Sequence, residues 1–148
     1  MRQQLLPELG PAGSRVVLLV DDNPDFCESC ITRLEEEAMQ MNPDVRVTFA
    51  TLRSRRSFDE MVALLEAEGR LADVVYALVD LKLPTTAEQR EEEETDQIQN
   101  GCHVLDSLRR MEKPTYLVSS VPREQVNKRV RKRFRVNFVE KKDFSSQS

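Results

Sequence analysis

Short apolar runs that recur between longer amphipathic stretches constrain the fold more than any other feature of the chain. The runs are rich in β-branched residues, as is typical of strands buried on both faces of a sheet. They occupy residues 15–20, 45–50, 73–79, 115–119 and 136–140. Strands that alternate with helices form a parallel sheet with helices on both faces. The sequence therefore predicts an α/β fold with a doubly wound, five-stranded parallel sheet.

Start signals and apolar stripes predict four helices between these runs. Asn23 is a good N-cap and Pro24 suits the first helical position, so the first helix is expected to run to about Met41. Its apolar stripe consists of Cys27, Cys30, Ile31, Leu34, Ala38 and Met41. Ser57 and Glu60 match a capping box for a second helix that ends near Gly69. A third helix is expected over 101–111 and a fourth over 122–133.

Two segments carry unbalanced charge. Residues 85–100 hold one basic residue, Arg90, and six acids: Glu88, Glu91, Glu92, Glu93, Glu94 and Asp96. This segment is expected to be a charged loop or an exposed helical excursion. Residues 123–135 hold one acid, Glu124, and seven bases: Arg123, Lys128, Arg129, Arg131, Lys132, Arg133 and Arg135. One hypothesis is that the acidic segment shields this basic helix, and the alternative is two independently solvated charge runs.

Composition narrows the class of protein. The 148 residues suit one domain, and the net charge of −4 argues against general nucleic-acid binding. No apolar run is long enough to span a membrane, and the first residues lack the features of a signal peptide. Residues 1–14, with two prolines and two glycines, are expected to form a flexible lead. An odd number of cysteines makes a disulfide framework improbable, so the cytoplasm is the expected compartment.

Cys27 and Cys30 form a CxxC motif, which in some proteins is a redox pair. The favoured interpretation is that both thiols lie on the buried face of the first helix, because free cysteine behaves as a small hydrophobe. Cys102 and His103 are adjacent, so as helix residues they would point in different directions and do not complete a zinc site.

Polar residues gather at the carboxyl ends of the predicted strands. Asp21 and Asp22 follow the first strand, Asp80 the third, Ser119 ends the fourth and Lys141 follows the fifth. Ligands of open parallel sheets bind at this edge. Clustered carboxylates repel unless a proton or cation joins them, and an all-oxygen site suits Mg²⁺ or Mn²⁺. A carboxylate can also act as nucleophile and form an acyl phosphate, with hydroxyl and ammonium donors for the phosphoryl oxygens.

At these positions the chain resembles the response-regulator receiver domains of two-component signalling, which have the CheY-like fold. The resemblance is carried by VVLLVDDNPDF, YALVDLKLP, Asn100-Gly101, LVSS and FVEKKDF, and it covers about residues 15–144. It implies strand order 2-1-3-4-5 and a cytoplasmic phosphoprotein of a phosphorelay. Residues 85–100 then form an acidic insertion and residues 145–148 a tail.

The resemblance also implies roles for individual residues. Asp80 would be the phosphoacceptor, and Asp21, Asp22, Asp80 and the backbone carbonyl of Lys82 would hold Mg²⁺. Ser119 and Lys141 would bind the phosphoryl group, and Phe138 would be the switch aromatic. The Lys82 side chain either pairs with the phosphoryl group and slows its hydrolysis, or points into solvent. The implied kinase-side partner is a histidine kinase or a phosphotransfer protein.

The chain departs from the family pattern in having only KDFSSQS after Lys141, where a fifth helix is usual. That helix is expected to be absent, truncated or supplied by a partner, which would favour a dimer or another association. Output is expected through an unidentified protein at the basic helix 123–135, rather than through nucleic acid.

Three functions compete on these residues. The first is a receiver that catalyses only its own phosphorylation and dephosphorylation. The second is an interaction module that keeps the fold but works without phosphorylation. The third is a Mg²⁺-dependent aspartyl-phosphate phosphatase, which would need a second acid where Lys82 stands. The complete set of Asp21, Asp22, Asp80, Ser119 and Lys141 favours the first.

Overall fold

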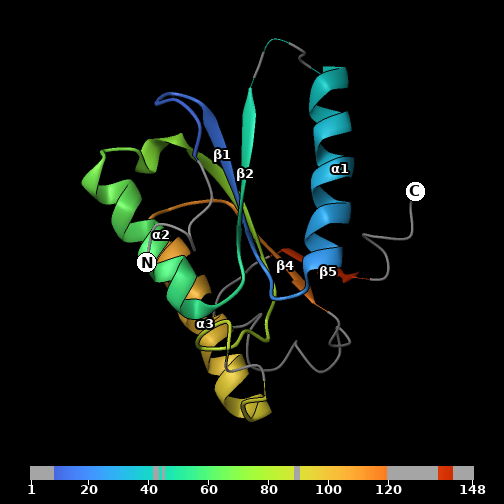
Figure 1. Cartoon of the computed structure of the whole chain (residues 1–148), viewed down its shortest axis with the longest axis vertical. Helices are drawn as coiled ribbons and strands as arrows, with labels where there is room; N and C mark the ends of the chain where they lie inside the picture. Colours follow the sequence, from blue (N-terminus) through green and yellow to red (C-terminus); the bar gives the residue numbers. More distant parts are fainter. Residues whose placement is uncertain (1–8, 42–43, 45, 89–90, 120–136, 142–148) are drawn as a thin grey trace.

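The computed structural model describes the chain except for residues 1–8, 42–43, 45, 89–90, 120–136 and 142–148, and it describes residues 137–140 through their backbone alone. All strands are parallel, in the order β2-β1-β3-β4-β5 (Figure 1). The strands are β1 (Arg15–Val20), β2 (Val47–Leu52), β3 (Val74–Val79), β4 (Thr115–Ser119) and β5 (Asn137–Glu140). The predicted α/β class, the strand order and the parallel sheet are confirmed.

Side chains of β1, which lies between β2 and β3, alternate between two core layers. Val16, Leu18 and Val20 contribute to one buried cluster, and Val17 and Leu19 contribute to the other. Helix α1 (Pro24–Met41) covers one face of the sheet, while α2 (Arg55–Ala67) and α3 (Glu94–Arg110) cover the opposite face (Figure 1). Because β1 is buried on both faces, its sequence is a continuous apolar run rather than an alternating one.

Helix α1 begins as predicted. The Asn23 side-chain oxygen accepts hydrogen bonds from the backbone N–H groups of Asp25 and Phe26, at 3.0 and 3.2 Å. These bonds satisfy donors that have no partner within the helix. Cys27 and Cys30 are buried, but Met41 is 87% exposed. The prediction that Met41 continues the apolar stripe of the buried face was therefore wrong, because Met41 is the last helical residue and its side chain lies mostly in solvent.

Helix α2 begins earlier than predicted. Its N-cap is Ser54 rather than Ser57, and Ser57 is the third helical residue, which completes the capping box. The Ser54 hydroxyl accepts from the Ser57 N–H, and the Ser57 hydroxyl accepts from the Ser54 N–H, both at 3.1 Å. The N–H groups of the first two helical residues, Arg55 and Arg56, donate to the carbonyls of Pro84 and Thr85 respectively. The loop after β3, which is remote in sequence, thus helps to fix where α2 starts.

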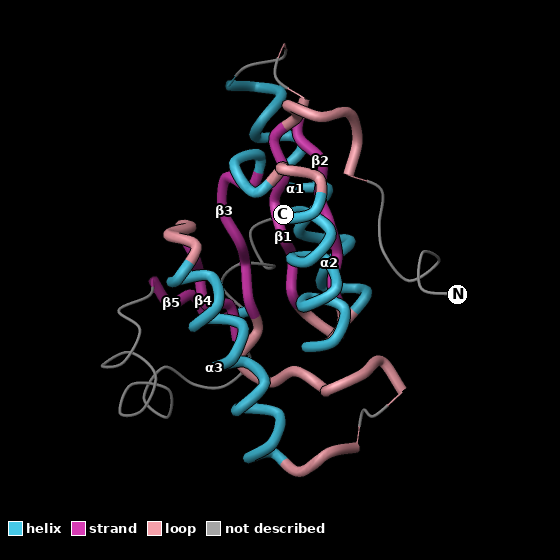
Figure 2. The backbone as a smooth tube through the Cα atoms, turned by 90° about the vertical axis from the view of Figure 1, so that its left-hand side faces the viewer, coloured by secondary structure: helices cyan, strands magenta, loops and turns pink. Residues whose placement is uncertain are grey.

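Helix α3 begins at Glu94, seven residues before the predicted start at Gly101. Figure 2 shows its first turns extending past the edge of the sheet. Acidic residues are favourable there because they face the positive end of the helix dipole, and partly buried Ile98 packs against the core. Residues 85–100 were expected to form either a charged loop or an exposed helical excursion. Residues 94–100 are helical, and the described residues of 85–93 form a loop.

The lead segment packs against the domain where it is described. Leu9 is buried, and the guanidinium of Arg70 donates to the carbonyls of Gly10 and Pro11 at 3.0 Å. The Gly13 N–H donates to the carboxylate of Asp73 at 3.1 Å. Residues 9–14 therefore pack at the amino end of the sheet, and residues 1–8, the rest of the expected flexible lead, lie outside the described residues.

Several expectations concern residues outside the described ranges. They are the fourth helix over 122–133 and the basic charge run over 123–135. The expected absence or truncation of a fifth helix and the tail over 145–148 also concern residues outside these ranges. Among the helices that the structure does describe, none is both long enough and apolar enough to cross a bilayer.

Candidate functional site

The backbone ladder places the aspartates at one edge of the sheet. Asp21 follows β1, and its N–H donates to the Leu52 carbonyl at the end of β2, at 2.9 Å. Asp80 follows β3, and its N–H donates to the Val20 carbonyl at the end of β1, at 2.8 Å. Each aspartate is thus fixed by its neighbouring strand, and their side chains start from adjacent positions.

Three carboxylates meet at this edge. Oxygen atoms of Asp21, Asp22 and Asp80 lie within 4.8 Å of one another. Asp21 is 3% exposed and Asp80 is 6% exposed, while Asp22 is partly exposed. Burial of like charges this close is unfavourable, so the cluster needs a proton or a cation to be stable.

Lys141 supplies one cation. Its Nζ atom lies 2.9 Å from Asp21 Oδ2 and 3.3 Å from Asp80 Oδ2. The same ammonium lies 4.7 Å from the centre of the Phe26 ring, in a cation–π contact. Phe26 comes from the first turn of α1, so this helix, β1, β3 and the end of β5 all contribute to the site.

The pKa values of these groups are displaced by burial and by each other. Burial, and next the charge of Asp21, raise the pKa of Asp80 to about 7, against the opposing effect of Lys141. Burial also raises the pKa of Asp21, although Lys141 and the Asn23 N–H favour its charged form. Burial by itself would lower the pKa of Lys141, but Asp80 and Asp21 outweigh that effect and raise it. The ammonium therefore stays charged at neutral pH, whereas burial and the charge of Asp21 favour the protonated form of Asp80.

Two buried carboxylate oxygens at the site, Asp21 Oδ2 and Asp80 Oδ1, accept no hydrogen bond from any described residue. Asp21 Oδ2 lies in an ion pair with Lys141, so Asp80 Oδ1 is the less satisfied of the two. A buried acceptor without a partner is costly, and a hard divalent cation bound by oxygen atoms would satisfy it. Asp21, Asp22 and Asp80 could hold Mg²⁺ or Mn²⁺, and the ion would neutralise negative charge on phosphoryl oxygens when bound. The residues present fit such an ion.

The remaining predicted site residues lie nearby in the fold. Ser119 is fully buried at the carboxyl end of β4, next to β3. Phe138 lies in β5, but its side chain is outside what the structure describes. The Lys82 ammonium lies 3.1 Å from Glu94 Oε2 at the start of α3, so it neither points freely into solvent nor contacts the aspartates.

Two neighbouring residues brace the loop that follows Asp80. The Asn100 side chain is buried and donates to the Leu83 carbonyl at 2.8 Å. Gly101 is so close to this loop that a Cβ atom would lie 1.9 Å from the Leu81 carbonyl oxygen. The Asn-Gly pair was noticed in the sequence, but it lies in the middle of α3 rather than at its start, and it holds the helix against the loop.

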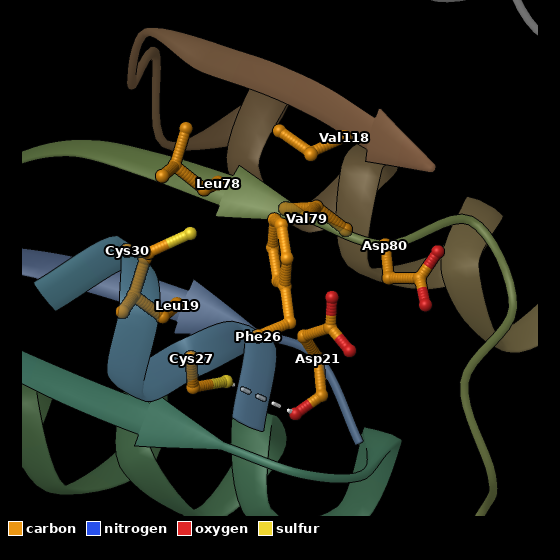
Figure 3. Close-up of a pocket in the computed structure, with 9 residues that line it drawn as sticks. All are labelled: Leu19, Asp21, Phe26, Cys27, Cys30, Leu78, Val79, Asp80 and Val118. Atoms are coloured by element: carbon orange, nitrogen blue, oxygen red, sulfur yellow. Dashed lines mark hydrogen bonds between the residues drawn. The ribbon is translucent and has the colours of Figure 1, made fainter. Parts of the chain in front are cut away.

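A small cavity lies behind the aspartates, with about 10 Å³ of space, roughly what one water molecule needs (Figure 3). Cys27 and Cys30 line it, and the Cys27 thiol donates to the Asp21 carbonyl at 3.6 Å. Burial raises the pKa of both thiols to about 12, so they remain protonated. This agrees with buried, unreactive cysteines, which was the favoured interpretation of the CxxC motif.

Phe26 was not foreseen as a site residue. The sequence carries one relevant signal, an aromatic residue in the first turn of the helix that follows the acidic strand end. That signal does not show that a lysine at the end of β5 lies over the ring, because the two residues are more than a hundred positions apart.

No protein-family model and no curated protein matches the sequence. The structure is similar to the bacteriophytochrome response regulator AtBRR, with a TM-score of 0.52 and 23% identity, over 90% of this chain and 83% of that one. It is similar to the response regulator RcsB of Salmonella typhimurium, with a TM-score of 0.54 and 13% identity, over 90% of this chain and 55% of that one. The Mn²⁺-bound form of response regulator Rcp1 matches with a TM-score of 0.51 and 17% identity, over 84% of this chain and 78% of that one. The chain therefore has the fold of response-regulator receiver domains.

Proposed function

We propose that this chain is a phospho-accepting receiver domain, in which Asp80 takes the phosphoryl group with the help of Mg²⁺ or Mn²⁺. The observation that carries the proposal is the grouping of Asp21, Asp22, Asp80 and Lys141 at the carboxyl edge of a 2-1-3-4-5 parallel sheet. Three solved structures with this fold are response regulators, and one of them is a Mn²⁺-bound form.

The proposed reaction is a transfer of one phosphoryl group. An Asp80 carboxylate oxygen attacks the phosphorus of the donor, the bond from phosphorus to the donor's leaving group breaks, and an acyl phosphate forms. Lys141 is already 3.3 Å from Asp80 and would balance the added negative charge, and Ser119 at the end of β4 would donate to a phosphoryl oxygen. Water later attacks the phosphorus and releases inorganic phosphate.

The proposed partners follow from this chemistry. The donor would be a histidine kinase or phosphotransfer protein, and the output would be contact with another protein, with the basic run 123–135 as the candidate surface. The chain would catalyse only its own phosphorylation and dephosphorylation. A phosphatase acting on external esters is disfavoured, because Lys82 stands where such an enzyme needs a second acid.

Mass spectrometry of the intact protein after incubation with acetyl phosphate and Mg²⁺ tests the proposal. We expect the mass of one phosphoryl group to be gained by the wild-type chain and not by Asp80→Asn. Asp106→Asn is a matched control, because Asp106 pairs with Arg109 and Arg110 on α3 and lies outside the site. If a phosphotransfer protein also fails to modify the wild-type chain, the proposal is overturned in favour of a module that works without phosphorylation.

A further inference from the structure

The acidic segment is built onto the rim of the aspartate site. The N–H and the hydroxyl of Thr85 both donate to the Glu92 carboxylate, the latter at 2.8 Å. The Gln97 side-chain amide donates to the Glu92 carbonyl at 2.9 Å, and the Leu83 N–H donates to the Gln97 carbonyl at 3.2 Å. These bonds join the start of α3 to the loop that leaves Asp80.

Lys82 lies on that loop between two anchored neighbours. Leu81 and Leu83 are both buried, so the backbone of Lys82 is fixed while its side chain lies partly exposed, at 31%. Asn100 and Gly101 hold this same stretch of loop against α3. The only freedom left to Lys82 is therefore the direction of its side chain.

Glu94, the first residue of α3, sets that direction. Its Oε2 atom lies 3.1 Å from the Lys82 ammonium, and its side chain is 68% exposed. An ion pair this exposed contributes little free energy. A phosphoryl group carries close to two negative charges and would compete well for the same ammonium.

We propose that Glu94 is a positioning residue, which holds Lys82 away from Asp80 and thereby shortens the lifetime of the acyl phosphate. This inference rests on the proposed phosphorylation of Asp80. With Glu94 in place, the Lys82 ammonium is shared between the α3 carboxylate and the phosphoryl group. Without it, Lys82 pairs with the phosphoryl oxygens and hinders attack by water.

The test is the rate at which purified, phosphorylated protein loses its phosphoryl group, followed by intact mass in Mg²⁺ buffer. Glu94→Gln should lengthen the lifetime about two- to fivefold, the range expected for release of an exposed ion pair. Glu94→Asp keeps the charge and should stay closer to the wild-type rate. Asp96→Asn removes the same charge from the same helical turn, at an exposed residue, and should leave the lifetime unchanged.

The variant Lys82→Ala separates positioning from a general charge effect. If Glu94 acts through Lys82, then Glu94→Gln has no effect on the lifetime when Lys82 is alanine. A lengthening that persists in the Lys82→Ala background, or equal lifetimes for Glu94→Gln and wild type, overturns the inference and leaves the proposed function intact. A wild-type chain that never gains the phosphoryl mass overturns both.

Discussion

Arg70 and Asp80 lie just before and just after β3 and are almost equally buried, at 7% and 6% exposed, yet their surroundings differ. The Arg70 guanidinium donates to the Asp73 carboxylate at 2.9 Å and to three backbone carbonyls of the lead segment. Asp80 has one oxygen near Lys141 and another with no donor among the described residues, and it faces two further carboxylates.

The buried charges at the two ends of β3 therefore have different consequences, one for the stability of the fold and the other for ligand binding. A buried charge that is paired and has a hydrogen-bond acceptor at each nitrogen, like Arg70, fixes the structure. A buried charge close to like charges, like Asp80, is unfavourable until a ligand of opposite charge binds. The amino end of the sheet therefore stabilises the fold, whereas the carboxyl end holds the carboxylates that, under the proposed function, would bind a cation and take a phosphoryl group. Three predictions test this contrast.

The largest effect is expected at the amino end. Arg70→Ala should lower the free energy of unfolding by about 3 kcal/mol, because it leaves the buried Leu9 carbonyl without its donor and removes the ion pair with Asp73. Arg109→Ala is the control, since Arg109 is 58% exposed and its ion pair with Asp106 should contribute less than about 1 kcal/mol. Urea unfolding followed by circular dichroism measures both. A cost at Arg70 no larger than that at Arg109 would contradict the contrast.

At the carboxyl end, a substitution is expected to raise the free energy of unfolding rather than lower it. Burial raises the pKa of Asp80 from 3.8 to about 7, so between these pH values the unfolded chain has released a proton that the folded chain retains. Stability from this group is full below pH 4, falls as the pH rises towards 7, and falls no further above it. Asp80→Asn has no carboxyl group to titrate at this position, so its free energy of unfolding does not fall in this pH range through this group.

At pH 8 the Asp80→Asn variant should therefore be more stable than wild type by about 2 kcal/mol, since each unit of pKa shift is worth about 1.4 kcal/mol and part of the gain is lost with the Lys141 contact. At pH 4 the advantage should vanish. Urea titrations at the two pH values measure the difference. A variant that is less stable than wild type at pH 8 would show that the carboxylates are not in conflict.

The smallest effect is expected from the cation. Mg²⁺ at ten times its dissociation constant should stabilise the wild-type chain by about 1.4 kcal/mol. Asp80→Asn should lose most of this gain, and Asp96→Asn should retain it, because Asp96 lies outside the cluster of carboxylates. Thermal unfolding with and without Mg²⁺, at matched ionic strength, gives the shift. Equal shifts in the two variants would place the ion elsewhere.

Local patterns predicted the strands and the start of α1 well. Apolar runs placed β1, β3, β4 and β5 within a residue of their observed bounds, and Asn23 caps α1 as expected. The prediction for β2 was wrong by two residues, because the strand runs over Val47–Leu52 rather than 45–50. The starts of α2 and α3 were wrong, because both depend on the loop after β3. Pro84 and Thr85 carbonyls accept from the first turn of α2, and Glu92 and Gln97 bind the same loop at the start of α3.

The sequence by itself determined the alternation of strands and helices and the aspartates at the strand ends, since both follow from local hydrophobic period and from chain order. Only the tertiary structure decided which groups meet. Lys141 lies between Asp21 and Asp80, Glu94 pairs with Lys82, and Arg70 binds the lead segment. Apart from Glu94 and Lys82, these partners are about sixty residues or more apart, and contacts at such separation are set by how the elements pack rather than by any local pattern.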